Sequence, residues 1–269
     1  ESWRWTPIGV GVLTGAADRR VQRAISARLG PLPGWTMGYG FDLQEWVGGE
    51  DLQQWARRIH EESGWPHLLA ARGVPLEGAD SIYSYDGFGR GVPLATTEGG
   101  PRSFDEVVAD LEGSDDHPHL YEERHTYLRS GFDLDMAGTR RLLWWQAMAG
   151  GMGGFFGFYS TGTHPYPAPE QLRTHHRFWH GGSRFRLDLR HEEEGTSGAA
   201  LVGEGRAVFY QEDTASVTVD LSWSGRSLPA VAVDTTVEYE EVSLGDLSPS
   251  RQTLELPHRS DWAIAVGGF

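Results

Sequence analysis

The sequence predicts a chain in two parts, an α/β part made of strand–helix units and an all-β antiparallel part. Before about residue 170, apolar runs alternate with segments of helical periodicity, and glycines separate them. From residue 184 onward, short segments of period-two alternation follow one another with turn residues between them. Strands that alternate with helices form parallel sheets, whereas closely spaced short strands form antiparallel sandwiches or small barrels. We therefore predict two domains, 1–180 and 181–269.

The α/β part is expected to begin with a helix at residues 17–29. Its apolar residues recur every three or four positions, which places them on one face: Ala17, Val21, Ala24, Ile25 and Leu29. The Gly/Pro cluster at 30–34 ends this helix. A buried strand within 35–43 and a helix at 50–63 are expected next, so that strand and helix already alternate.

The remaining elements of this part continue the alternation. We expect strands at 67–71, 81–85 and 119–123, helices at 103–112 and 135–149, and a Gly-rich strand at 150–159. About five strands fit either a doubly wound sheet or part of a barrel, because a complete parallel barrel has eight strands and typically ~250 residues.

The all-β part contains seven or eight short predicted strands. They lie at 184–190, 199–205, 206–212, 216–223, 229–236, 238–244, 252–257 and 261–269. This number and spacing predict an antiparallel sandwich or small barrel.

Composition narrows the range of functions. The net charge is −15, and a chain this acidic is unsuited to nucleic acid, whose phosphates require basic patches. Such a charge suits a neutral substrate. There is no Cys, which excludes disulfides and thiol chemistry, and no apolar run is long enough to span a membrane. The first residues, 1–7, lack the features of a signal peptide.

Carboxylates follow two of the predicted strands. Asp42 ends the strand within 35–43, with Glu45 three residues further on, and Glu122 and Glu123 end the strand at 119–123. A pair of carboxylates is what glycoside hydrolysis needs, one as acid and the other as nucleophile or base. The ordinary alternatives are a helix cap for Asp42 and a solvated ion pair for Glu122.

Other polar and aromatic side chains stand near the same strand ends. Trp46, Arg72, Tyr85 and His125 are candidates for contacting a sugar, through ring stacking or hydrogen bonds to hydroxyls. Each also has a structural interpretation, such as core packing for Trp46 and Tyr85 or an ion pair for Arg72 and His125.

Metal and cofactor chemistry are not predicted. Histidines gather at two places, His117, His119 and His125 in one and His175, His176 and His180 in the other, but no tight ligand motif occurs. The glycines at 150–154 lack the Lys-Ser/Thr ending of a phosphate loop, so close packing of a strand explains them better.

Three stretches resemble clan-A glycoside hydrolases, and most of all the apiosidase-like group (DUF4038, also called collagenase-like). Residues 34–73 (GWTMGYGFDLQEWVGGEDLQQWARRIHEESGWPHLLAARG) resemble its fourth and fifth strand units, and residues 117–127 (HPHLYEERHTY) its seventh strand. Residues 139–158 resemble its seventh helix and closing strand. The C-terminal segments AVFYQED, VDLSW, AVAVDTT and LPHRSDWAIAV resemble its collagen-binding-type β-sandwich.

The resemblance implies strands four to eight of a TIM-type (β/α)₈ barrel followed by the sandwich. It assigns Asp42, in Gly40-Phe41-Asp42, as acid/base and Glu123 as nucleophile, with Glu45 and Glu122 as alternatives. It also implies a polysaccharide or oligosaccharide substrate, a retaining mechanism without a cofactor, and an extracellular or periplasmic location.

Residues 1–16 are too few to supply strands one to three of such a barrel. The expectation is therefore a fragment of a longer protein, self-association, or a partner that completes the barrel. Two other functions are considered. One is a non-catalytic carbohydrate-binding or surface-interaction protein, favoured by exposed aromatics such as Trp223 and Tyr239; the other, a peptidase, has no supporting motif.

Overall fold

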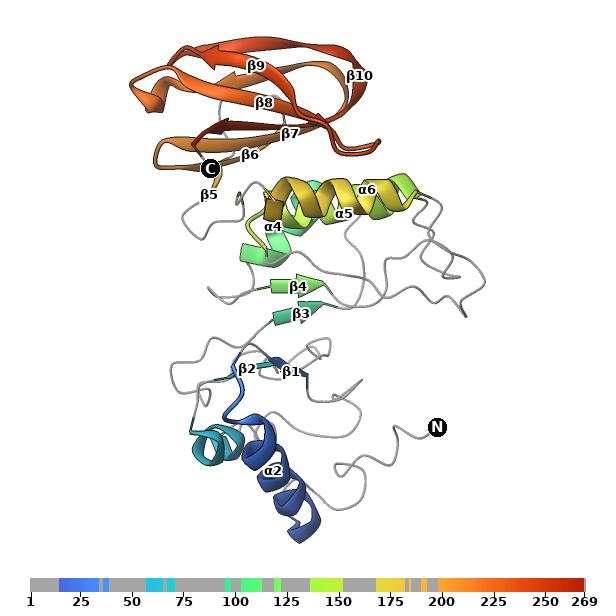
Figure 1. Cartoon of the computed structure of the whole chain (residues 1–269), viewed down its shortest axis with the longest axis vertical. Helices are drawn as coiled ribbons and strands as arrows, with labels where there is room; N and C mark the ends of the chain where they lie inside the picture. Colours follow the sequence, from blue (N-terminus) through green and yellow to red (C-terminus); the bar gives the residue numbers. More distant parts are fainter. Residues whose placement is uncertain are drawn as a thin grey trace. The chain divides into compact units, whose positions relative to one another are not determined.

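Two groups of elements can be followed in the structure, a computed structural model of the chain (Figure 1). The residues described are 15–33, 36–38, 57–64, 67–70, 95–97, 103–112, 119–121, 136–151, 168–181, 184, 190–192 and 198–268. The chain divides into two compact units, a first unit of Glu1–Gly100 with Glu112–Glu122 and a second unit of Pro101–Leu111 with Glu123–Phe269. This grouping does not test a division by fold type at residue 180, which stays a prediction.

Parallel strand pairs characterise the first unit. Strand β1 (Thr36–Gly38) pairs in parallel with β2 (Leu68–Ala70), and β3 (Ala95–Thr97) pairs in parallel with β4 (His119–Tyr121). A helical segment at 57–63 lies between β1 and β2 in the chain, and α4 (Phe104–Glu112) lies between β3 and β4. These are strand–helix–strand connections, so the predicted alternation is confirmed for the described elements. β3 was not predicted, and the strand predicted at 81–85 lies outside the described residues.

Helix α2 (Ala16–Leu29) matches the predicted helix in its bounds but not in its buried face. Asp18, Gln22 and Ser26 are 2–3% exposed, whereas Val21 and Leu29 of the predicted inward face are each 40% exposed. The prediction of the buried face is therefore wrong. Ser26 Oγ lies 3.5 Å from the Ile59 carbonyl, and Arg23 pairs with Glu62, so the polar side of α2 faces the 57–63 helix.

The second unit contains three helices and a six-stranded antiparallel sheet among its described residues. Helix α5 (Met136–Met148) matches the predicted helix at 135–149. Helix α6 (Pro169–His176) continues directly into a π-helical turn, η4 (Arg177–Gly181), and was not predicted. The Gly-rich strand predicted at 150–159 lies largely outside the described residues.

The sheet has the strand order β5-β6-β7-β10-β8-β9. Its strands are β5 (Arg190–Glu192), β6 (Ala199–Gly203), β7 (Arg206–Asp220), β8 (Leu228–Asp234), β9 (Val242–Leu247) and β10 (Arg251–Gly267). All pairings are antiparallel, as predicted. The strands form one hydrogen-bonded sheet rather than two. They are fewer than predicted because β7 and β10 each absorb two predicted strands.

Both long strands bend where the sequence suggested a turn. In β7 the bend lies at Asp213, whose φ is 47°. In β10 the register with β7 shifts between Glu255 and Ser260 and again before Trp262. The bends divide each strand into two limbs, and the same apolar cluster contains residues from both limbs.

The two faces of the sheet bury different clusters. The sheet cluster contains alternate residues of the strands: Ala200, Ala207, Phe209, Val217, Val219, Leu221, Leu228, Ala230, Ala232, Leu247, Leu254, Leu256, Trp262, Ile264 and Val266. The helix–sheet cluster joins the opposite face to α5 and η4: Trp144, Ala147, Met148, Phe178, Trp179, Ala199, Leu201, Val208, Tyr210, Val233, Ala263 and Ala265. Figure 1 shows α5 and α6 along this second face. Each fully buried large side chain contributes about 1.5–3 kcal/mol.

Candidate active site

The carboxyl ends of β1 and β2 lie side by side. Their register pairs Thr36 with Leu68 and Gly38 with Ala70, so both strands end at the same level. Asp42 follows four residues after Gly38, and Arg72 two residues after Ala70. Active sites of parallel α/β barrels are built at this end of the strands. The described backbone therefore brings the carboxyl ends of β1 and β2 to one edge, and Asp42 and Arg72 themselves lie outside the described residues.

The second pair of strands ends in the same way. Thr97 pairs with Tyr121, and Glu122 and Glu123 follow Tyr121 directly. The strand that precedes the proposed nucleophile is thus present where the sequence placed it. Its neighbour, β3, is the one that sequence reasoning missed, because Ala95–Thr97 is a short run without alternation.

All eight predicted site residues lie outside the described residues. They are Asp42, Glu123, Glu45, Glu122, Trp46, Arg72, Tyr85 and His125. Their assigned roles stay predictions, and the distance between the two carboxyl groups does too.

The opposite end of β2 is held by hydrogen bonds. His67, just before β2, is 3% exposed, and its Nε2 lies 2.7 Å from the Gly30 carbonyl. His60 Nε2 lies 2.9 Å from the His67 carbonyl. These bonds fasten α2 and the 57–63 helix to the amino end of the strand. Such contacts at the amino end serve stability rather than chemistry in parallel barrels.

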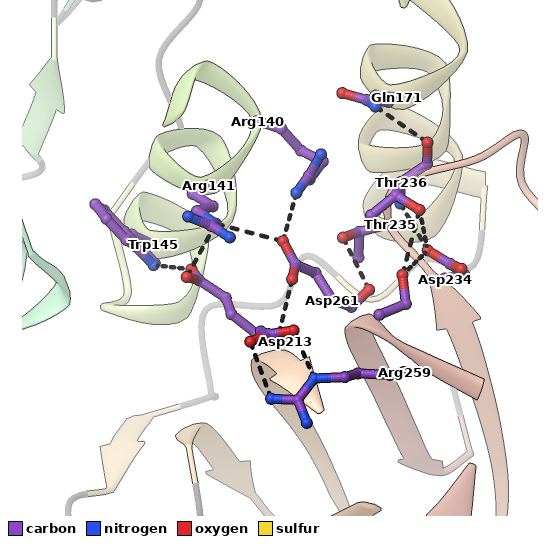
Figure 2. Close-up of polar contacts among 12 residues, drawn as sticks. Arg140, Arg141, Trp145, Gln171, Asp213, Asp234, Thr235, Thr236, Arg259 and Asp261 are labelled. Atoms are coloured by element: carbon purple, nitrogen blue, oxygen red, sulfur yellow. Dashed lines mark hydrogen bonds and ion pairs between the residues drawn. The ribbon is translucent and has the colours of Figure 1, made fainter. Parts of the chain in front are cut away.

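A second group of charged residues lies between α5 and the sheet (Figure 2). Asp261 on β10 accepts hydrogen bonds from Arg140, from Arg141 and from the Asp213 backbone N–H. The side chains of Arg140 and Asp261 are 7% and 5% exposed, so this ion pair is buried. Asp261 also fixes the chain through its backbone, since its carbonyl accepts from the N–H and hydroxyl of Thr235.

Glu212 on β7 extends this group. Its carboxylate accepts a hydrogen bond from Trp145 Nε1 at 2.6 Å and forms an ion pair with Arg141, whose Nε lies 3.0 Å away. Burial raises the pKa of Glu212 above its ordinary value, against the opposing effect of Arg141. For Arg141 burial lowers the pKa, but Glu212 and Asp261 outweigh it and the net shift is upward. The guanidinium therefore stays charged between the two carboxylates.

These two carboxylates do not form a hydrolytic pair. Asp261 holds two arginines and a backbone N–H, and Glu212 holds Arg141 and Trp145. Glycosidase carboxylates must instead face a bound sugar, one of them able to deliver a proton. The group is a fastening between α5 and the sheet. Sequence reasoning missed it because its members lie up to 121 positions apart.

Asp234, at the end of β8, organises the next turn. It is 7% exposed. Its carboxylate accepts from the Thr236 N–H and hydroxyl, from Ser260 Oγ at 2.8 Å and from His258 Nε2 at 2.7 Å. Burial alone would raise the pKa of Asp234, but these hydrogen bonds outweigh it and hold the pKa below its ordinary value. Gln171 on α6 donates to the Thr236 carbonyl, so this turn also carries the helix (Figure 2).

Tyr239 is engaged at the same interface and does not present a free ring. Its hydroxyl accepts from Arg184 at 3.0 Å and donates to Glu241. The guanidinium of Arg177 lies over its ring, 4.8 Å from the centroid. The expectation that Tyr239 offers an exposed aromatic surface is therefore wrong. Trp223 does remain exposed, at 37%.

The histidines of α6 and η4 are occupied in packing. His175 lies edge-on against Trp144 with ring centroids 5.1 Å apart, and His176 stacks on His180 at 4.7 Å. Among the residues that the structure describes, no group of three or more His, Cys, Asp or Glu side chains is arranged to hold a metal ion. Within the same residues, no helix has the length and apolar character to cross a membrane.

Neither a protein-family profile nor a curated protein sequence matches this chain. Its fold is similar to that of solved TIM-barrel glycoside hydrolases. For one glycoside hydrolase the TM-score is 0.67 at 15% identity, covering 93% of this chain and 68% of that chain. For a family 5 glycoside hydrolase from Bacteroides vulgatus the TM-score is 0.68 at 14% identity, covering 93% of this chain and 66% of that chain. For a GH30 endoxylanase from Clostridium papyrosolvens the TM-score is 0.58 at 9% identity, covering 93% of this chain and 70% of that chain.

Identities this low show a common fold and leave the reaction open. The chain spans about two thirds of the length of these structures. The architecture of its described part is thus similar to that of part of a glycoside hydrolase.

Proposed function

We propose that this chain carries the C-terminal part of the catalytic barrel of a retaining glycoside hydrolase, joined to an antiparallel sheet. The observation that carries the proposal is the pair of parallel strand units whose carboxyl ends are followed within four residues by Asp42 and within two by Glu123. In a closed barrel the carboxyl ends of all strands meet on one face, which would bring the two residues to one site. The similarity to glycoside hydrolase folds supports the same conclusion.

In the proposed mechanism Glu123 attacks the anomeric carbon and Asp42 protonates the departing oxygen. Water, activated by Asp42, then releases the sugar from Glu123 with overall retention. This requires the two carboxyl groups ~5–5.5 Å apart. Glu122 and Glu45 are the alternative carboxylates, and Trp46, Arg72, Tyr85 and His125 are proposed to contact the substrate.

The substrate class proposed is a polysaccharide or oligosaccharide. The net charge of −15 disfavours polyanions and is compatible with neutral sugars. Membership of the apiosidase-like group, an extracellular or periplasmic location, and completion of the barrel by self-association or a partner belong to the same proposal.

The deciding experiment tests catalysis and the nucleophile together. A panel of aryl glycosides identifies a hydrolysed sugar, and the matching aryl 2-deoxy-2-fluoroglycoside then traps the covalent intermediate. We expect mass spectrometry of the digested adduct to locate the sugar on Glu123. The Glu123→Gln variant should lose about 10³-fold or more in kcat, since the covalent intermediate cannot form without the carboxylate nucleophile.

Glu122→Gln is the matched control, because it alters the neighbouring carboxylate and leaves Glu123 in place. It is expected to retain activity within about tenfold, as for a residue outside the chemical step. An adduct on Glu122, or equal activity of the Glu123→Gln variant, would refute the assignment of the nucleophile. Turnover of no glycoside by a chain that unfolds cooperatively would refute the proposal that this chain by itself is a hydrolase.

A further inference from the structure

Trp223 is the exposed aromatic side chain among the large apolar residues that the structure describes on the surface. It is 37% exposed, whereas Trp144, Trp179 and Trp262 are at most 1% exposed. The other exposed large apolar residues in the described part are aliphatic: Val21, Leu29, Leu32 and Val237. A partly exposed indole offers an apolar face, and its N–H, to a binding partner.

The turn that carries Trp223 is rigid. It is the 3₁₀ turn η5 (Ser222–Ser224) between β7 and β8, closed by Gly225 at a φ of 64°. The Ser224 N–H donates to the Leu221 carbonyl at 3.0 Å, and Ser224 Oγ donates to the Arg226 carbonyl at 2.7 Å. Leu221, directly before the turn, is completely buried in the sheet cluster and so anchors the turn to the sheet.

The indole itself is fixed by one edge. Trp223 Nε1 donates to the Asp220 carbonyl at 3.0 Å. The polar atom of the ring is therefore already paired, and what remains for a partner is apolar π surface. A side chain fixed before binding loses little entropy when a partner stacks on it.

Charged residues lie at the end of the strand that leads into this turn. The carboxylate of Asp220 accepts from the Ser222 N–H at 2.9 Å, and this hydrogen bond, with that of the Ser222 side chain, lowers the pKa of Asp220. Arg251 is the registered partner of Asp220 on β10. The strand end that leads into the turn thus carries an anion, held by the Ser222 N–H, and is paired with a strand position that carries a cation. Both groups are able to hydrogen-bond hydroxyl groups.

This combination matches a sugar ring, which has an apolar C–H face and a rim of hydroxyls. Binding sites in general combine apolar lining with a few fixed polar groups in this way. We propose that η5 is a carbohydrate-binding site, with Trp223 as the stacking platform for a sugar unit of a neutral polysaccharide. The site would hold the polymer independently of the carboxylates proposed for hydrolysis. The choice of a sugar as the ligand rests on the proposed function.

The test compares polysaccharide binding with hydrolysis of small substrates. Affinity electrophoresis of the whole chain is run in gels that contain soluble xylan, mixed-linkage β-glucan, xyloglucan or galactomannan. We expect at least one polymer to retard the chain, and Trp223→Ala to weaken that binding roughly tenfold or more, as truncation of an aromatic anchor does. Hydrolysis of aryl glycosides by Trp223→Ala should stay at the level of the unaltered chain.

Val237→Ala is the matched control, because Val237 is also exposed, at 49%, and apolar. It is expected to bind like the unaltered chain. Thermal unfolding checks that Trp223→Ala remains folded, and Trp223→Phe, which keeps a stacking ring, should recover part of the affinity. Retardation by none of the four polymers, or equal retardation of Trp223→Ala, would overturn the proposal.

The outcomes also separate this inference from the proposed hydrolase. Binding that depends on Trp223 without any glycoside turnover would retain the binding site and reject the enzyme. Glycoside turnover together with binding that does not depend on Trp223 would retain the enzyme and reject the binding site.

Discussion

At the scale of single residues, Asp261 connects the sheet to helix α5 through ion pairs. Its carboxylate is buried and is shared by Arg140, Arg141 and the Asp213 backbone N–H. Asp261→Ala would leave the buried Arg140 guanidinium without its anion. Removing one member of a buried pair typically costs about 3–5 kcal/mol. We expect a loss of this size in the free energy of unfolding, measured by urea denaturation.

Arg259→Ala provides the comparison for Asp261, because it breaks an exposed ion pair and leaves the left-handed Asp213 in place. Asp213 forms a two-fold ion pair with Arg259, but both side chains lie in solvent, at 71% and 69% exposure. Water screens such a pair, so this substitution should change the urea midpoint far less. Equal losses in the two variants would mean that Asp261 does not act through a buried pair.

His175 should make the stability of the second unit depend on pH. Part of the residue reaches solvent, but its Nε2 is buried without a hydrogen-bond partner and its ring packs on Trp144. Burial lowers the pKa of His175 to about 4, against an ordinary value of 6.5. The unfolded chain therefore takes up a proton at a pH where the folded chain does not. The contribution of the neutral His175 to the free energy of unfolding is complete above pH 6.5 and is lost as the pH falls toward about 4.

His175→Phe retains an aromatic ring and removes the titration. We expect the free energy of unfolding of this variant to fall less steeply from pH 6.5 to about 4 than that of the unaltered chain. The difference is at most about 3 kcal/mol, because one pKa unit corresponds to ~1.4 kcal/mol. Parallel pH curves for the two proteins would show that His175 is accessible to protons when folded.

At the scale of elements, helix α2 shows where hydrophobic periodicity succeeds and where it fails. The pattern predicted the helix bounds to within one residue at the start, but it pointed Val21 and Leu29 inward, and these are exposed. Gln22 is 3% exposed, and neither atom of its amide has a hydrogen-bond partner. Burying an unpaired polar group costs roughly 1–3 kcal/mol.

Gln22→Leu is therefore expected to stabilise the chain by about 1–3 kcal/mol, since it fills the same space without an unpaired amide. The midpoint of thermal unfolding measures this gain. Val21→Ala, on the exposed side, should change stability by no more than about 0.5 kcal/mol. A loss of stability in the Gln22→Leu variant would indicate that Gln22 is hydrogen-bonded and that α2 is turned the other way.

Helix α6 was not predicted, for a physical reason. Its contacts to the rest of the unit include hydrogen bonds in place of an apolar stripe: Gln171 and Thr174, both buried, bond to the carbonyls of Thr236 and Val237. No periodic pattern of apolar residues reports such bonds. The length of strand β7 was missed because Glu212-Asp213-Thr214 has the composition of a turn, while in the fold Asp213 only bends the strand.

Strands β1, β2 and β4 could be predicted because each lies in an apolar run that is identified without a distant partner, whereas the short β3 was missed. The carboxylates beyond β1 and β4, Asp42 and Glu123, could be predicted in the same way as far as their position in the chain is concerned. Their geometry depends on how separate strands come together, which the pattern along one chain does not contain. The cluster around Asp261 could not be predicted either, because its members are distant in the sequence and come together only in the fold.

At the scale of the whole molecule, α5, η4 and the sheet share one apolar core, so we expect them to fold as one unit. Trp144, Met148 and Phe178 are completely buried in a cluster whose other half belongs to the strands. A chain that ends at residue 181 would expose this apolar surface and leave Arg140 without Asp261. We expect it to be insoluble or to bind a hydrophobic dye, as assayed by sedimentation and fluorescence. A soluble, cooperatively unfolding product would show that the sheet is a detachable module.

The bent strands β7 and β10 have a consequence for how this molecule can change over evolutionary time. Because each runs through both limbs of the sheet, neither limb can be exchanged or duplicated without the other. We expect insertions to be tolerated instead at the tight turns between strands, such as Glu204–Gly205 and the η5 turn that carries Trp223. Surface recognition can therefore diversify at the turns, while the framework that supports them is inherited as one piece.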